Sequence, residues 1–187
     1  KALSSLGDSA RLIDTIRRVH DRGPSPVTHV DLDTVLPAAI GQVLPHGDGV
    51  EIMYSGTHDA VVTATELLPD LFANLIDNAV KHSGGKASIV VTVRPYYHQG
   101  IDYVRVDVAD NGPGIPDPQK SVLFSRGERG QTRASGHGMG LFLVANIVSE
   151  IGGRVWVEDR VPGDHTLGAR FVVLLPRKSG ASIDQVR

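Results

Sequence analysis

The segment NLIDNAVKH, residues 74–82, lies in a run of apolar residues whose spacing predicts a long helix over about residues 66–82. We expect Thr63 or Thr65 to cap this helix, and Pro69 is tolerable because it falls in or near the first turn. At 100° per residue, one side of the helix is apolar and the other is polar. The apolar side carries Leu68, Leu71, Phe72, Leu75, Ile76 and Ala79. The polar side carries Asp70, Asn74, Asp77, Asn78 and Lys81.

The residue types on the polar side favour a binding role over a solvated surface. A solvated helix face favours Glu, Lys and Gln, because Asn and Asp are poor helix formers. An Asn carbonyl oxygen is a hard neutral ligand that suits Mg²⁺, and a Lys one turn further on suits phosphate oxygens.

A second segment, VADNGPGI at residues 108–115, ends an expected strand in a carboxylate. The Asp110 carboxylate can accept a hydrogen bond from an exocyclic amine, and Gly112 and Gly114 let a flat ring approach the backbone. Taken alone, the segment is better explained as an Asn-Gly-type turn between two elements.

A third segment, GHGMGL at residues 136–141, places three alternating glycines directly before an expected helix that starts near Leu141. A glycine-rich entry to a helix N-terminus leaves backbone N–H groups free to hold anions. An unrelated loop before a helix would have a similar sequence.

The remaining pattern predicts an α+β fold, a two-layer α/β sandwich with a mixed β-sheet and about three packed helices. Residues 2–20 have helical spacing and stop at Gly23-Pro24-Ser25-Pro26, and Asp31 or Asp33 is expected to cap a further helix to about Val43. Val50–Tyr54 and Ala60–Thr63 are expected to pair as strands across Gly56. Further strands are expected at Ala87–Arg94, Ile101–Ala109, Val155–Glu158 and Ala169–Leu175.

Composition narrows the class of protein. The chain has 187 residues, a net charge of −2 and no cysteine, which fits one main domain in a reducing compartment and excludes thiol chemistry. The charge offers no basic field for nucleic acid, so we expect no nucleic-acid partner. No apolar run approaches the ~20 residues of a membrane span. Because the chain begins at Lys1, we expect a piece of a longer protein, cytoplasmic in location, whose parent is free to carry a membrane anchor.

In order, NLIDNAVKH, DNGPGI, LFSRG (residues 123–127) and GHGMGLFL resemble the ATP-binding catalytic domain of two-component sensor histidine kinases. That family shares a superfamily with type II topoisomerases, heat-shock chaperones and mismatch-repair ATPases. The resemblance covers about residues 31–176 and implies a Bergerat-type ATP-binding fold with ATP and Mg²⁺ as cofactors. It implies an end of a dimerisation or phosphoacceptor helix at residues 1–22, a linker at 23–30 and a flexible tail at 177–187.

The resemblance also implies roles for individual residues. Asn78 would ligate Mg²⁺, Lys81 would lie near phosphate, and Asp110 would bind the adenine amine. The other residues that it places around the nucleotide are Asn74, His82, Gly112, Gly114, Ile115, Phe124, Gly136, His137, Gly138, Met139, Gly140, Leu141 and Thr166. Within this set, Phe124 would anchor a mobile lid, the glycines of 136–140 would hold the triphosphate, and Thr166 would complete the adenine pocket.

Position 74 favours a kinase over a hydrolase. Hydrolytic members of the superfamily carry a Glu there as general base, whereas Asn74 is neutral and accepts no proton. We therefore expect phosphoryl transfer, with Asn74, Lys81 and Arg126 in catalytic roles and a basic lid over residues 115–135 that closes on the γ-phosphate.

The acceptor histidine is expected outside this chain. His20-Asp21 imitates the family's acceptor box, but it lies where its helix ends. The implied partners are the phosphoacceptor and dimerisation domain of the same parent, and the receiver domain of a response regulator. We expect a homodimeric parent and a monomeric fragment that does not phosphorylate itself. Two alternatives stay open: a protein serine kinase of the same superfamily, and a non-catalytic nucleotide-binding or partner-docking module.

Overall fold

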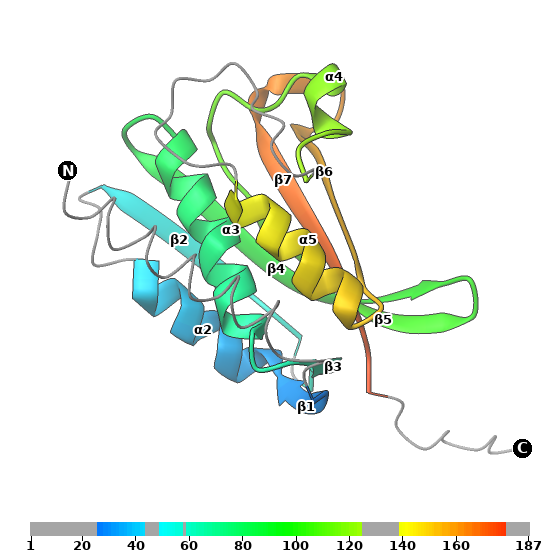
Figure 1. Cartoon of the computed structure of the whole chain (residues 1–187). Helices are drawn as coiled ribbons and strands as arrows, with labels where there is room; N and C mark the ends of the chain where they lie inside the picture. The colour runs from blue at the N-terminus through cyan, green and yellow to red at the C-terminus, as the bar shows by residue number, and fades with distance from the viewer. Residues whose placement is uncertain (1–25, 44–48, 58, 125–138, 179–187) are drawn as a thin grey trace, which may run out of the picture.

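A computed structural model describes residues 26–43, 49–57, 59–124 and 139–178. The expected helix at 2–20, with His20, lies outside these residues. Helices α2, α3 and α5 cover one face of a five-stranded sheet (Figure 1), which confirms the predicted two-layer α+β architecture with a mixed sheet. No helix in the described part of the chain is long and apolar enough to cross a membrane.

The sheet has the strand order β2-β4-β5-β7-β6. Its only parallel pair among the described strands is β2 with β4, and the other three pairs are antiparallel. The strands are β2 (Val50–Ser55), β4 (Ala87–His98), β5 (Ile101–Ala109), β6 (Arg154–Val161) and β7 (Asp164–Pro176). The last four are longer than, or as long as, the sequence predicted, and the β4–β5 hairpin extends beyond the rest of the sheet (Figure 1).

The core lies between the sheet and the helices α2 (Leu32–Val43), α3 (Leu68–His82) and α5 (Met139–Glu150), with a short α4 (Asp117–Lys120) beside β6. The apolar side of α3 is buried as its spacing predicts, including Phe72 and Leu75 at 0% exposure. Burial of each such side chain contributes about 1.5–3 kcal/mol, so α3 is held with its polar side turned away from the sheet.

One strand pairing was predicted wrongly. β2 and β3 (Val61–Ala64) do not form a hairpin, because β3 pairs antiparallel with a short strand that the sequence analysis did not find, β1 (Thr28–Asp31). β1 has only Val30 partly buried and so carries almost no apolar signal. Thr28 to Val30 fall in the segment that was predicted to be a linker.

The helix caps were predicted with mixed success. Asp31 Oδ1 accepts the backbone N–H of Asp33 at 2.9 Å, so Asp31 caps α2. The cap of α3 was wrong: its N-cap is Leu67, which has no side-chain cap bond. The Thr65 hydroxyl instead accepts the N–H of Leu67 at 3.4 Å, in the turn before the helix. Pro69 does lie in the first turn, where its missing N–H costs nothing.

Charged side chains form a network across strands β5, β6 and β7. Arg105 Nε donates to Asp107 Oδ1 at 2.7 Å, and Arg105 Nη2 donates to Glu158 Oε2 at 3.0 Å. Trp156 Nε1 donates to the other oxygen of Glu158 at 2.8 Å, and its ring lies 5.6 Å from the Arg105 guanidinium carbon. Arg105 and Asp107 are only 8% and 7% exposed, so the network satisfies charges that burial would otherwise penalise.

Candidate functional site

The Asp110 carboxylate lies directly after β5 and is 3% exposed. Its Oδ1 accepts the backbone N–H of Gly112 at 2.8 Å and the backbone N–H of Ala169 at 3.3 Å. Within the described part of the chain, no hydrogen bond is made to Oδ2. One oxygen of the carboxylate is therefore fixed by the backbone, and the other is left to accept a donor from a ligand.

Burial raises the pKa of Asp110 above the usual range of an aspartate. The backbone N–H groups of Gly112 and Ala169 act in the opposite direction, as do the positive charges of His82 and Arg160, but they do not cancel the effect of burial. A buried carboxylate held in this way gains from a ligand that supplies one more hydrogen-bond donor.

Asn111 holds the loop that carries Asp110 against the start of β4. Its Oδ1 accepts the N–H of Ser88 at 2.9 Å, and its Nδ2 donates to the carbonyl of Lys86 at 3.0 Å. The sequence analysis gave Asn111 no role, because an Asn before a Gly is typical of any turn. Its contact partners lie 23 and 25 residues away, which local sequence does not reveal.

The glycines of the loop make room for the protein's own backbone. A Cβ at Gly112 would lie 2.9 Å from the carbonyl oxygen of His82, at the end of α3. Gly114 has a φ of +66°, and a Cβ there would overlap the carbonyl oxygen of His165 in β7. The predicted reason for these glycines was access for a flat ring. That role stays a prediction, and the structure shows in addition a close backbone approach, which brings the Asp110 loop, α3 and β7 together.

On the polar side of α3, Asn74 faces the start of α5. Asn74 Nδ2 donates to the Asp70 carbonyl at 2.8 Å, and a Cβ at Gly140 would lie 2.9 Å from Asn74 Oδ1. Gly140 thus allows α5 to begin close to α3. The Asn74 amide is held in one orientation by its own helix.

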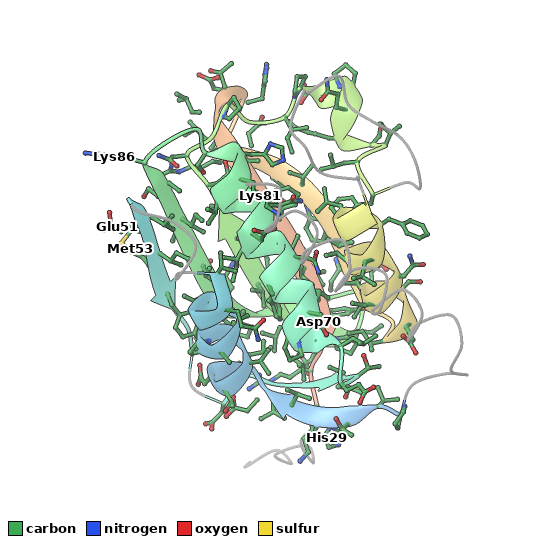
Figure 2. All side chains as sticks on the ribbon, turned by 60° about the vertical axis from the view of Figure 1, so that its left-hand side comes forward. His29, Glu51, Met53, Asp70, Lys81 and Lys86 are labelled. Carbon is green, nitrogen blue, oxygen red and sulfur yellow. The ribbon has the colours of Figure 1, made fainter. Side chains whose placement is uncertain are left out.

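One turn later on the same side, Asn78 is half-buried and makes no hydrogen bond with its side chain to the residues described. Lys81 Nζ lies 2.5 Å from Asp77 Oδ2, and both side chains are about half exposed (46% and 41%). Figure 2 shows Asp70 and Lys81 at opposite ends of α3, so the polar side runs the length of the helix up to the Asp110 loop.

The other predicted residues lie around this centre or outside the described residues. Phe124 packs edge-on against Phe171 of β7, with ring centroids 6.4 Å apart, and Ile115 and Leu141 pack against the core. Arg126, Gly136, His137, Gly138 and the side chain of Met139 lie outside the described residues, as does most of the predicted lid.

Thr166 is exposed, and its hydroxyl donates to Asp164 Oδ1 at 2.6 Å. The residue that faces Asp110 from β7 is Ala169, three positions later, through its backbone N–H. A role for Thr166 in the pocket stays a prediction. Ala169 was missed because a small apolar residue carries no signal for binding.

Asp110, the polar side of α3 and the start of α5 all lie in one segment of the chain that matches a known protein family. Residues 64–179 match the family described as "Histidine kinase-, DNA gyrase B-, and HSP90-like ATPase". The chain belongs to this family. Within it, the chain is similar to the ATP-binding catalytic domain of sensor histidine kinases, as the sequence analysis predicted.

Individual relatives agree with this placement. The chain is 34% identical over 158 residues to the sensor protein kinase CarS of Pseudomonas aeruginosa, which covers 83% of this chain and 33% of CarS. The structure of full-length ShkA in complex with AMPPNP is similar to this chain, with a TM-score of 0.72 and 25% identity. The match covers 97% of this chain and 38% of ShkA. A complex of the histidine kinase ThkA with the response regulator protein TrrA shares the fold, with a TM-score of 0.67 at 20% identity, covering 92% of this chain and 49% of that chain. The chain therefore spans about a third of CarS.

Proposed function

We propose that this chain transfers the γ-phosphoryl group of ATP to a histidine on a dimerisation domain that lies outside it. The choice of phosphoryl transfer over hydrolysis rests on the residue at position 74, which is Asn74. This residue stands where hydrolytic relatives have a catalytic carboxylate, and its amide donates to its own helix at 2.8 Å. It offers no base to activate water, so the protein's part is to bind, orient and screen the phosphates.

In this proposal Asp110 Oδ2 accepts the exocyclic amine of adenine, because Oδ1 already accepts two backbone N–H groups. The polar side of α3, which carries Asn78 and Lys81, then runs from the base towards the phosphates. Lys81 contributes a positive charge whose present neighbour is Asp77.

The residues present fit a magnesium ion that is brought by ATP. No group of three or more His, Cys, Asp or Glu side chains suited to a metal occurs among the described residues, so no all-protein cage exists there. Mg²⁺ is commonly held by few protein ligands together with substrate phosphates, and Asn78 offers an amide oxygen with no hydrogen bond to a described residue. The bound ion would neutralise charge on the phosphates.

The wider function of the parent protein is part of the same proposal. We infer a homodimeric sensor kinase whose ATP-binding domain works in the cytoplasm and whose phosphoryl group passes to a response regulator. The ThkA–TrrA complex and the sensor-kinase relatives support this inference. A serine kinase of the same superfamily is the second candidate, because the residues that bind ATP would be the same.

The test is incubation of the chain with radiolabelled ATP and Mg²⁺, first alone and then with the acceptor domain of the parent protein. We expect no label on the chain alone and acid-labile label on the acceptor, since phosphohistidine is hydrolysed by acid. Asn78→Ala should abolish labelling, and Arg154→Ala, an exposed change on β6, should leave it intact. Acid-stable label would favour the serine kinase, and release of free phosphate without transfer would contradict the proposal.

A further inference from the structure

Arg160, near the end of β6, contacts the backbone of the candidate adenine-binding residue Asp110. Its Nη1 donates to the backbone carbonyl of Asp110 at 3.4 Å. Its own carbonyl accepts Nη2 of Arg170 at 2.7 Å, which ties this part of β6 to β7. Arg160 is half-buried, so its charge is only partly screened by solvent.

Gly168 creates the space in which Arg160 and Asp110 meet. Gly168 has a φ of +115°, and a Cβ there would overlap the carbonyl oxygen of Asp110 and lie 3.1 Å from Arg160 Cδ. The next residue, Ala169, exchanges backbone bonds with Asp110: its carbonyl accepts the Asp110 N–H at 2.9 Å and its N–H donates to Oδ1. The Asp110 backbone is therefore held by β7 on one side and by the Arg160 side chain on another.

The charges that face Asp110 come from two elements. His82 at the end of α3 and Arg160 on β6 are the positive groups among the described residues that favour its ionised form. The remaining favourable contacts are the two backbone N–H groups, from its own loop and from β7. His82 is exposed, whereas Arg160 is half-buried and carries a guanidinium, which stays charged at every physiological pH.

We propose that Arg160 is a positioning residue for nucleotide binding, which holds the Asp110 backbone in place and supplies a permanent positive charge beside its carboxylate. This inference rests on the proposed role of Asp110 in accepting the adenine amine. Arg160 acts through Asp110 and not by contact with the nucleotide. Its charge offsets part of the cost of burying an ionised carboxylate, so the acceptor for the amine stays available at neutral pH.

The sign of the expected pH effect follows from the chemistry. Asp110 accepts the amine only when it is ionised, so ATP affinity is lost as the pH falls through the pKa of Asp110. Burial already raises this pKa, and removal of the Arg160 charge raises it further. The loss of affinity should therefore begin at a higher pH in Arg160→Ala than in the unmodified chain.

The experiment measures the dissociation constant of ATP by calorimetry from pH 5 to pH 8 for the unmodified chain, Arg160→Ala, Arg160→Gln and Arg160→Lys. We expect Arg160→Ala to weaken binding by about 3- to 10-fold at pH 7, the effect of one hydrogen bond, and by a larger factor at pH 5.5. Arg160→Lys keeps the charge and should restore the pH profile, while Arg160→Gln should not. Arg154→Ala, on the same strand and exposed, should match the unmodified chain.

Each profile is repeated in the His82→Gln background, because His82 is the other positive group that favours the ionised form of Asp110. An Arg160→Ala profile that runs parallel to the unmodified one, or coincides with it, would overturn the positioning role. The variant Asp110→Asn separates this failure from that of the proposed function. If Asp110→Asn binds ATP as well as the unmodified chain, the adenine role of Asp110 is wrong. If Asp110→Asn binds weakly but the Arg160 profiles are parallel, only the role of Arg160 is wrong.

Discussion

Replacement of Asp110 by Asn tests the adenine-binding role more cleanly than replacement by Ala. Asp110 Oδ1 accepts two backbone N–H groups, from Gly112 and Ala169. Asp110→Ala would leave both buried donors unpaired, at about 1–3 kcal/mol each, so a loss of affinity would be confused with damage to the fold. Asp110→Asn keeps an oxygen for these donors and replaces only Oδ2 by an NH₂ group, which cannot accept the adenine amine.

The expected loss follows from one unmade hydrogen bond to a charged, buried acceptor. That bond is worth about 1.5–3 kcal/mol, so its loss should raise the dissociation constant of ATP by roughly 10- to 150-fold. Because burial raises the pKa of Asp110, its ionised form is costly to the folded state at neutral pH. A neutral Asn avoids this cost, so the free energy of unfolding in urea should be unchanged or slightly higher.

The assay compares ATP with inosine triphosphate, whose base has a carbonyl in place of the amine. The unmodified chain should prefer ATP, since its carboxylate accepts a hydrogen bond from the amine and repels the carbonyl oxygen. In Asp110→Asn the preference should collapse, because the new NH₂ group donates to that oxygen. An unchanged ratio of the two affinities, in a variant with unchanged stability, would refute the role of Asp110.

Three further predictions use the contacts described above. Gly114→Ala should lower the free energy of unfolding in urea by about 2–5 kcal/mol, because the new Cβ overlaps a carbonyl oxygen at a residue with positive φ. Gly152→Ala is the control: its φ is +69° but the space around it is open, so it should cost only about 1–2 kcal/mol. Equal losses in the two variants would show that steric overlap plays no part. Asn78→Ala should abolish the tightening of ATP binding by Mg²⁺ and leave metal-free binding largely intact, and a variant that still responds fully to Mg²⁺ would move the metal site elsewhere. Burial tends to raise the pKa of Glu158, but hydrogen bonds from Trp156 and Arg105 outweigh burial and lower this pKa. Glu158→Gln should therefore lower the free energy of unfolding by about 0.5–1 kcal/mol at pH 7, after allowance for solvent screening. The difference from the unmodified chain should vanish as the pH falls below the usual range of a glutamate, and a difference that persists there would contradict the ion-pair origin.

The elements predicted well are those in which local pattern and burial agree. The apolar side of α3 was predicted residue by residue, because six apolar residues at helical spacing leave one way to pack against the sheet. The long strands β4 and β5 were found from their β-branched residues. In each case a single element carries enough apolar area to specify its own position.

The errors fall where a position depends on a distant partner. β3 was predicted to form a hairpin with β2, but its partner is β1. The paired residues Thr28 and Ala64 are 36 positions apart in the sequence (64 − 28). The candidate site shows the same limit. Asp110 was predicted from its own segment, whereas Asn111, Arg160, Gly168 and Ala169 were missed, since their significance lies in contacts that join β4, β5, β6 and β7.

The missed residues share one property that connects fold and function. None of them stood out as a binding residue in its own segment of sequence, yet each contacts Asp110 or its loop. A carboxylate that is 3% exposed keeps a free acceptor oxygen only if backbone donors hold its other oxygen and nearby positive charge offsets its burial. In the proposed site, the motif supplies the carboxylate that accepts the adenine amine, while contacts from β6 and β7 hold that carboxylate in place. On this reasoning, changes in β6 and β7 should alter ATP affinity in this chain without any change in the motifs themselves.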